Sequence, residues 1–178
     1  MTLPLFAKLP KQYVILDTET TGLNPRNGDA ILELAALKID EGGTELGFFH
    51  SFINPRIPIS IGASMVNGLT DEFIADNGKL PEHVFPSFVA FCANCTLVGH
   101  NLIKFDLPFI NKHLEDLRLL SLRNPVLDTL ELSRAKLKIS NYKLGTIATH
   151  LSIPYIDAHR AENDVRITKE VFLKLVRM

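Results

Sequence analysis

The chain has 178 residues, of which 46% are hydrophobic and 22% are charged, as expected for a single globular domain. No run of about 18 apolar residues is present, which excludes a transmembrane helix, and the proline-interrupted N-terminus does not resemble a signal peptide, so we expect a cytoplasmic protein. The formal net charge is −1, so the chain lacks the overall positive charge of proteins that coat nucleic acid regardless of sequence. An enzyme that binds only the end of a strand is still compatible with this charge.

The first half of the chain predicts three strands. Tyr13–Glu19 is apolar on both alternating faces, which indicates a central strand covered on both sides. Two apolar runs, Ala30–Asp40 and Thr44–Ile53, are joined by Glu41-Gly42-Gly43 and predict a β-hairpin. Residues Asn54–Gly78 are expected to be irregular, with short helical pieces.

The second half of the chain predicts helices that alternate with short strands. The expected helices are Pro81–Ala93, Asp106–Leu117, a segment ending at Leu137, Tyr142–Leu151 and Arg160–Val176, and the expected strands are Thr96–His100 and Val126–Asp128. This order predicts one α/β domain over residues 1–178, with a mixed β-sheet flanked by helices and antiparallel hairpin strands.

Two carboxylates end the first predicted strand. Asp17 and Glu19 are two residues apart, so their side chains point to the same face of the sheet. Two adjacent anions at the end of a buried strand repel each other and lose hydration, which favours a bound cation. The alternative is that both side chains point into solvent beyond the end of the strand.

A third carboxylate lies on the apolar side of the last predicted helix. Asp164 precedes Thr168, Val171 and Phe172 by four, seven and eight residues, so it shares their face. The helix N-terminus stabilises such an anion by only about 0.3–1 kcal/mol, which is too little to offset burial. A metal ion is the natural compensation. His159 lies five residues earlier, on the entering loop, where a structural or exposed histidine is the alternative.

A fourth acidic residue opens the predicted helix after His100-Asn101. Asp106 follows Phe105 directly and lies two residues before Pro108. Asp favours the N-cap of a helix, so a capping function is the alternative to a place in the same acidic site. Phe105 is equally interpretable as a core aromatic residue or as a surface on which a base stacks.

Together these motifs resemble the DnaQ-like exonucleases, the DEDD superfamily, in the subgroup with a histidine in its last motif. This family includes proofreading epsilon subunits of bacterial DNA polymerase III. The matching segments are Ile15 to Leu23, His100-Asn101 with Phe105-Asp106, and His159-Arg160-Ala161 with Asp164, and weaker agreement lies in Glu33-Leu34-Ala35 and Leu127-Asp128-Thr129. The resemblance spans about residues 12–176 and implies a ribonuclease H-like fold.

The resemblance implies a catalytic site with two divalent ions. Asp17, Glu19 and Asp164 would hold one ion, Asp17 would bridge to the second, and Asp106 would support the second through water. Mg²⁺ or Mn²⁺ suits such oxygen ligands. His159 would take the proton from the attacking water, for which its ordinary pKa near 6.5 is suitable.

The resemblance also implies contacts to the 3′-terminal nucleotide. The expected substrate-binding residues are Thr20, Gly22, Leu23, Asn67, Asn101 and Phe105. Leu23 would pack on the terminal base. The sequence departs from the family at Asn67, where many relatives have histidine. Asparagine donates a hydrogen bond without a positive charge, which leaves open how the terminal nucleotide is gripped.

The implied function is a 3′→5′ exonuclease on single-stranded DNA that releases nucleoside 5′-monophosphates, with a DNA polymerase as an expected partner in proofreading. The alternative is an exoribonuclease on RNA 3′ ends or short oligoribonucleotides, because the 2′-hydroxyl contacts that would decide are not visible in the sequence. A non-catalytic binding module is disfavoured, since all five catalytic residues are present. No membrane partner is expected, and the sequence does not determine the oligomeric state.

The most basic stretch of the chain contains Arg134, Lys136, Lys138 and Lys143, with Tyr142 among them and no acid between Arg134 and Lys143. It is a candidate guide for a nucleic acid strand. The alternative is a solvated helix end and loop. The last predicted helix ends two residues before the C-terminus, so we expect a polymerase partner to use a folded surface or to belong to a longer parent.

Overall fold

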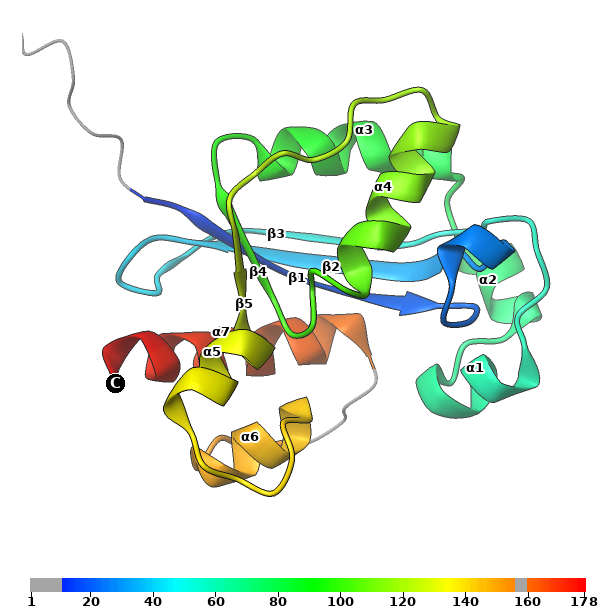
Figure 1. Ribbon diagram of the computed structural model, residues 1–178. Coiled ribbons are helices and arrows are strands. Elements are labelled where there is room, and N and C mark those ends of the chain that lie inside the picture. Colours follow the sequence, from blue (N-terminus) through cyan, green and yellow to red (C-terminus); the bar gives the residue numbers. More distant parts are fainter. Residues whose placement is uncertain (1–10, 156–159) are drawn as a thin grey trace, which may run out of the picture.

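The computed structural model describes residues 11–155 and 160–178. Within them, five strands form one sheet in the order β3-β2-β1-β4-β5 (Figure 1). Their bounds are β1 Tyr13–Thr20, β2 Ile31–Ile39, β3 Glu45–Phe52, β4 Thr96–Gly99 and β5 Val126–Asp128. β1, β2 and β3 pair antiparallel, whereas β4 and β5 continue the sheet parallel to β1. The predicted mixed sheet with an antiparallel hairpin is therefore confirmed.

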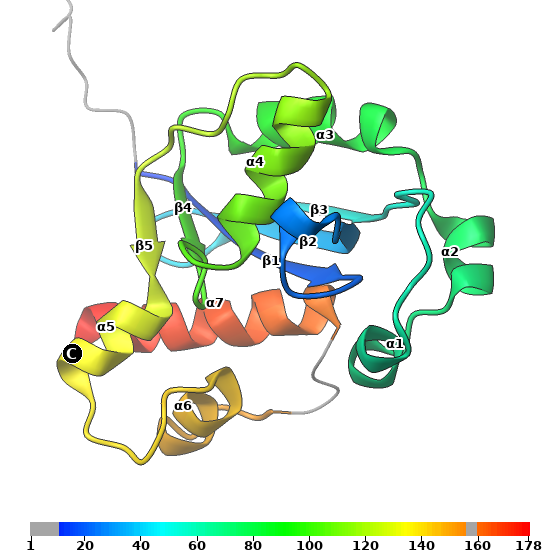
Figure 2. The same ribbon diagram turned by 45° about the vertical axis from the view of Figure 1, so that its right-hand side comes forward.

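Helices cover both faces of this sheet. α3 (Pro81–Cys92) and α4 (Asp106–Asp116) lie on one face, and α7 (Ala161–Arg177) lies on the other with α5 (Thr129–Lys136) beside it (Figures 1 and 2). α6 (Leu144–His150) packs outside α7, and α1 (Ile61–Asn67) and α2 (Asp71–Asn77) lie near the end of the sheet where β1 ends. The expected α/β fold is thus confirmed.

The central strand β1 is buried on both faces because its apolar residues alternate between two cores. Val14 and Leu16 pack in the core beneath α3 and α4, together with Phe88 and Phe109. Ile15 packs in the opposite core against α7. This arrangement confirms the interpretation of the apolar run as a covered central strand.

The predicted elements shift by one or two residues at their ends, and the largest shift has a local cause. α6 begins at Leu144 rather than at Tyr142. The Asn141 side chain accepts hydrogen bonds from the Lys143 N–H and the Thr146 hydroxyl, and the Tyr142 hydroxyl donates to the Leu137 carbonyl. These side-chain bonds fix an extended entry to the helix, and hydrophobic spacing alone does not predict them.

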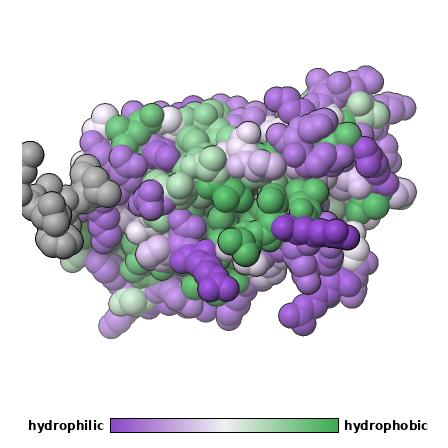
Figure 3. Space-filling view, turned by 90° about the horizontal axis from the view of Figure 1, so that it is seen from above, coloured by the Kyte–Doolittle hydropathy of each residue, from purple (hydrophilic) through white to green (hydrophobic). Residues whose placement is uncertain are grey.

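The described helices include none that is long and apolar enough to cross a lipid bilayer. Viewed from the side of α3 and α4, the surface has an apolar centre with mostly hydrophilic side chains around it (Figure 3). Apolar atoms normally contribute much of a globular protein's surface, so this face alone assigns no function.

Candidate active site

Three carboxylates converge where β1 faces the first turn of α7. Asp17, Glu19 and Asp164 each offer a carboxylate oxygen, and these oxygens all lie within 4.8 Å of one another. Asp17 and Glu19 project from β1 to the same face, and Asp164 lies on the buried stripe of α7 with Thr168, Val171 and Phe172. The structure thus brings together three of the acidic residues that the sequence analysis singled out.

The pKa values of this group reflect crowded negative charge. Burial, followed by repulsion from Asp106 and Asp164, raises the pKa of Asp17 well above its usual range. Burial and repulsion from Asp164 raise the pKa of Glu19 to about 8. Without a cation, the site therefore holds protons near neutral pH that ordinary carboxyl groups would have released.

Asp106 lies next to the three carboxylates and is held by β1. It is buried, and its Oδ1 accepts hydrogen bonds from the Thr18 N–H at 3.1 Å and from the Thr18 hydroxyl at 2.8 Å. Burial raises the pKa of Asp106 to about 7, although both Thr18 bonds lower it. The N-cap of α4 is Phe105, with no side-chain capping bond, so the capping alternative for Asp106 is wrong.

A buried glutamate on β2 forms an ion pair beside the carboxylates. Glu33 is paired with Glu19 in the sheet register and is fully buried. His50 Nε2 lies 2.8 Å from Glu33 Oε1, and Arg160 Nε donates to Glu33 Oε2 at 3.1 Å. Burial raises the pKa of Glu33, but the bonds to His50 and Arg160 outweigh it and leave the pKa below its ordinary value. Glu33 is therefore a fixed anion that positions the start of α7.

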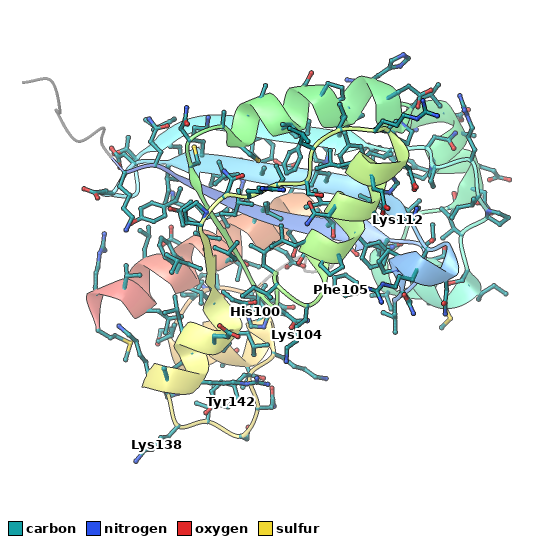
Figure 4. The ribbon with its side chains drawn as sticks, turned by 45° about the horizontal axis from the view of Figure 1, so that its top comes forward. His100, Lys104, Phe105, Lys112, Lys138 and Tyr142 are labelled. Atoms are coloured by element: carbon teal, nitrogen blue, oxygen red, sulfur yellow. The ribbon has the colours of Figure 1, made fainter. Side chains whose placement is uncertain are left out.

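The turn between β4 and α4 is held by Asp128. The Asp128 carboxylate accepts hydrogen bonds from the N–H groups of Asn101, Ile103 and Leu130. This buried side chain thus ties the turn that leads to Asp106 to the first turn of α5. His100 precedes the turn, and its Nδ1 lies 3.1 Å from the Thr129 hydroxyl (Figure 4).

A cavity of about 390 Å³ opens beside Glu19, between the end of β1, α1 and the start of α4. We call it the apolar pocket, because Leu23, Ala63, Val66 and Phe105 form much of its wall. It is lined by Thr18, Glu19, Thr20, Gly22, Leu23, Ser60, Gly62, Ala63, Val66, Asn67 and Phe105. Five of the six residues expected to contact the terminal nucleotide therefore share one cavity.

Of the side chains that line the pocket, Leu23 is exposed, whereas Phe105 and Asn67 also contact other parts of the fold. Leu23 is 83% exposed, which leaves its apolar surface free, whereas Phe105 also packs against Phe109 with ring centroids 5.2 Å apart. Buried Asn67 donates from Nδ2 to the Thr20 carbonyl at 3.3 Å. Asn67 thus joins α1 to the end of β1, which is a structural use of its hydrogen bond.

The remaining predicted site residues lie elsewhere. Asn101 lines a different cavity, which also contains Asp17 and Asp164. His159 lies outside the described residues. No pattern in the sequence assigns a function to Thr18, Arg160 or His50, yet their side chains bind Asp106 or Glu33.

The donor set at the carboxylate cluster fits a divalent cation. The cluster offers only oxygen ligands, which hard ions such as Mg²⁺ and Mn²⁺ prefer. Burial and the mutual repulsion of the carboxylates raise the pKa values of Asp17 and Glu19, and the charge of Arg160 lowers that of Glu19 only in part. A cation bound here would supply further positive charge.

Known proteins resemble this chain over most of its length. A family model described as Exonuclease, RNase_T, matches residues 14–172. The chain is 39% identical over 171 residues to DNA polymerase III PolC-type of Caldanaerobacter subterraneus subsp. tengcongensis, and 36% identical over 166 residues to that of Thermotoga maritima. These matches cover 96% and 93% of this chain but 12% of each relative, so the chain spans about an eighth of their length.

Solved structures share the fold. The zinc-bound complex of E. coli exonuclease I with single-stranded DNA superposes with a TM-score of 0.86 at 19% identity, over 94% of this chain and 40% of that one. Exonuclease X in complex with 5′-overhanging duplex DNA gives a TM-score of 0.73 at 23% identity, over 93% of this chain and 91% of that one. The predicted ribonuclease H-like fold and the resemblance to DnaQ-like exonucleases are confirmed, and the chain belongs to the RNase_T family of exonucleases.

Proposed function

We propose that this chain is a 3′→5′ exonuclease that hydrolyses single-stranded DNA from its 3′ end and releases nucleoside 5′-monophosphates. The observation that carries the proposal is the convergence of Asp17, Glu19 and Asp164 in a chain of the exonuclease family. The active unit would be a single domain over residues 1–178, with its core at about 12–176.

Asp17, Glu19 and Asp164 are the proposed metal ligands, with Asp17 shared between two ions and Asp106 supporting the second. Mg²⁺ or Mn²⁺ bound there would make water a stronger nucleophile and would stabilise charge on the phosphodiester oxygens. Thr18 orients the Asp106 carboxylate and offsets part of the effect of burial on its pKa, because both hydrogen bonds from Thr18 favour the charged form.

His159 is the proposed acceptor of the proton from the attacking water. It precedes Arg160 in the sequence, and the Arg160 carbonyl accepts the hydrogen bond from the N–H of Asp164. The ion pair of Arg160 with Glu33 therefore anchors the chain between the proposed base and a proposed metal ligand.

The apolar pocket is the proposed site of the 3′-terminal nucleoside. It adjoins Glu19 and has a volume of about 390 Å³, which lies within the range of small-molecule sites. Leu23 would pack on the base, Phe105 would contact its other side, and the backbone at Thr20 and Gly22 would meet the sugar. Asn101 would contact the nucleotide that precedes the terminal one.

Gly22, in the wall of the pocket, lies directly against the Asp29 side chain. A Cβ placed there would lie 2.3 Å from the Asp29 carboxylate, so any side chain would collide with it. Asp29 in turn accepts a hydrogen bond from the Asn24 N–H. The loop after β1 is therefore held tightly, and we expect substitutions at Gly22 to displace the wall of the pocket.

The 36–39% identity to PolC-type DNA polymerases favours a DNA substrate and a polymerase context. We infer that the chain removes misincorporated 3′ nucleotides for a DNA polymerase. This partner and task rest on the relatives, of which the chain matches only a small part.

The test is digestion of matched single-stranded DNA and RNA, labelled at the 3′ or the 5′ end, with Mg²⁺, Mn²⁺ or EDTA. The proposal predicts that metal ions cause immediate release of labelled mononucleotide from 3′-labelled DNA, with RNA cleaved more slowly. Faster cleavage of RNA would favour the exoribonuclease alternative. No cleavage with either metal, or first products released from the 5′ end, would overturn the proposal.

A further inference from the structure

A second cavity starts at the carboxylates and is lined by other residues than the apolar pocket. It has a volume of about 1290 Å³ and extends from Asp17 and Asp164 along α5, the α5–α6 loop and α6. We call it the basic groove. Its described lining shares no residue with that of the apolar pocket, which instead includes Glu19. The carboxylate cluster thus adjoins both a small pocket and a groove of about three times its volume.

The charges along the basic groove change sign with distance from the cluster. Among its described lining residues, the acids are Asp17 and Asp164, both at the cluster end. Farther along, Arg134, Lys143 and His150 line the wall. No ion pair in the described part of the chain involves Arg134 or Lys143, so both cations remain available to an anionic ligand.

The basic stretch from Arg134 to Lys143 contains four cations, of which two line the groove and two do not. Arg134 and Lys143 line the groove. Lys136 instead donates from Nζ to the Leu175 carbonyl at 2.7 Å, near the end of α7. Lys138 points away from the body of the molecule (Figure 4). A solvated loop therefore explains Lys138 but leaves the placement of Arg134 and Lys143 unexplained.

Two tyrosines line the groove, and one of them is held by a hydrogen bond. The Tyr142 hydroxyl donates to the Leu137 carbonyl at 3.0 Å, and the Arg134 guanidinium lies 6.0 Å from the centre of the Tyr142 ring. Tyr155 lies nearer the cluster, and the pKa of its hydroxyl is raised by burial and by the charges of Asp164, Asp17 and Glu19. An aromatic ring held beside cations that form no ion pair is an arrangement that single-stranded nucleic acids bind, by base stacking and phosphate contact.

We propose that the basic groove binds the nucleotides on the 5′ side of the scissile phosphodiester, with Arg134 and Lys143 contacting backbone phosphates and Tyr142 stacking on a base. The inference rests on the proposed function, since it extends the same strand from the apolar pocket across the carboxylates. It assigns one terminal nucleoside to the small pocket and several preceding nucleotides to the larger groove.

The kinetic test compares a dinucleotide, which cannot fill the groove, with a single-stranded DNA of about ten nucleotides. For the wild-type chain, kcat/KM should be higher on the longer substrate. In the double variant Arg134→Ala and Lys143→Ala, the ratio of the two kcat/KM values should fall about tenfold. Lys138→Ala is the matched control, since it removes a cation from the same loop outside the groove, and it should retain the wild-type ratio.

The binding test uses the same longer DNA, fluorescently labelled, in EDTA, so that no cleavage is needed. Each phosphate contact to a single strand contributes about 0.7 to the slope of log K against log salt concentration, so the double variant should lose about 1.4 from the slope. Tyr142→Ala should weaken binding about tenfold, whereas Tyr142→Phe, which keeps the ring, should retain most of the affinity.

The outcomes separate this inference from the proposed function. A wild-type chain without a length preference, or a double variant that keeps the wild-type ratio and salt slope, would overturn the groove assignment while cleavage persists. Equal effects of Lys138→Ala would also overturn it, because they would show a general charge effect. If no substrate is cleaved, the proposed function fails, and the binding test in EDTA still decides whether the groove holds a strand.

Discussion

Arg160 and Glu33 lie 127 residues apart in the chain, yet Arg160 Nε donates to Glu33 Oε2 at 3.1 Å. Glu33 lies on β2, where it is fully buried and is paired with Glu19 of β1. Arg160 is the N-cap residue of α7. This ion pair links the strand layer to the helix that carries Asp164. A chain that lost it would keep its acidic residues but would hold α7 less firmly against the sheet.

We therefore predict that Arg160→Ala lowers kcat about tenfold, because the ligand on α7 shifts relative to β1. Stability should fall by on the order of 1–2 kcal/mol, less than for a fully buried pair, because the Arg160 side chain is 43% exposed. Thermal unfolding and steady-state kinetics measure both effects. Arg166→Ala is the control, since Arg166 lies on the same helix but forms ion pairs at the surface, with Glu45 and Glu162, and its loss should change neither quantity appreciably.

Thr18 should lower the pKa of Asp106 in the metal-free chain. Thr18→Val removes the hydroxyl bond of 2.8 Å and leaves the backbone bond of 3.1 Å. The pKa of Asp106 should then rise above about 7, by about one pH unit, which NMR titration of the carboxyl group in EDTA measures. Thr18→Ser keeps the hydroxyl and should keep the wild-type titration curve. Superimposable curves for Thr18→Val and wild type would show that the Thr18 hydroxyl does not stabilise the ionised form of Asp106.

The metal-free chain should become less stable as pH rises. The pKa of Glu19 is about 8 in the folded chain against an ordinary value of 4.5, so between these values the folded state holds a proton that the unfolded state has released. Stability then falls with increasing pH across this window. In EDTA, Tm should drop by on the order of 5 °C between about pH 5 and pH 8, a change that scanning calorimetry resolves. Adding Mg²⁺ or Mn²⁺ should remove most of the decline, and a decline of equal size with metal present would argue against cation binding at these carboxylates.

Leu23 offers a test of the apolar pocket without a folding defect. Its side chain is 83% exposed, so Leu23→Ala should leave Tm nearly unchanged. Loss of its contact with the terminal base should raise KM about five- to tenfold while kcat changes less. Leu120→Ala is the control, because Leu120 is 87% exposed and lies outside the pocket lining. An unchanged KM for Leu23→Ala would remove Leu23 from the substrate contacts.

Local patterns in the sequence predict much of the candidate site. A spacing of two on a strand places Asp17 beside Glu19, and a spacing of four and seven on a helix places Asp164 on the stripe of Thr168 and Val171. Both patterns depend only on backbone geometry, so they can be recognised without any tertiary information. The same holds for the hairpin and for the alternation of helices with short strands.

The groups that position these carboxylates could not be predicted in this way. Thr18 and Asp106 are 88 residues apart, and a threonine in a strand gives no sign that its hydroxyl will meet a distant carboxylate. Glu33 did carry a signal, because it is a lone charge within an otherwise apolar stretch of β2. Its partners His50 and Arg160 come from other elements, so only the assembled fold identifies them.

The most direct measurement is the rate at which wild-type chain and Asp17→Asn release the 3′-terminal nucleotide of single-stranded DNA as Mn²⁺ is titrated. Burial and neighbouring carboxylates already favour the uncharged form of Asp17, so the neutral Asn side chain should leave the variant about as stable as wild type in EDTA, which controls for folding. If the carboxylate cluster holds the catalytic ions, Asp17→Asn lowers the rate by about 10³-fold or more at every Mn²⁺ concentration. A folded variant that cleaves within about tenfold of the wild-type rate would contradict the assignment of this site.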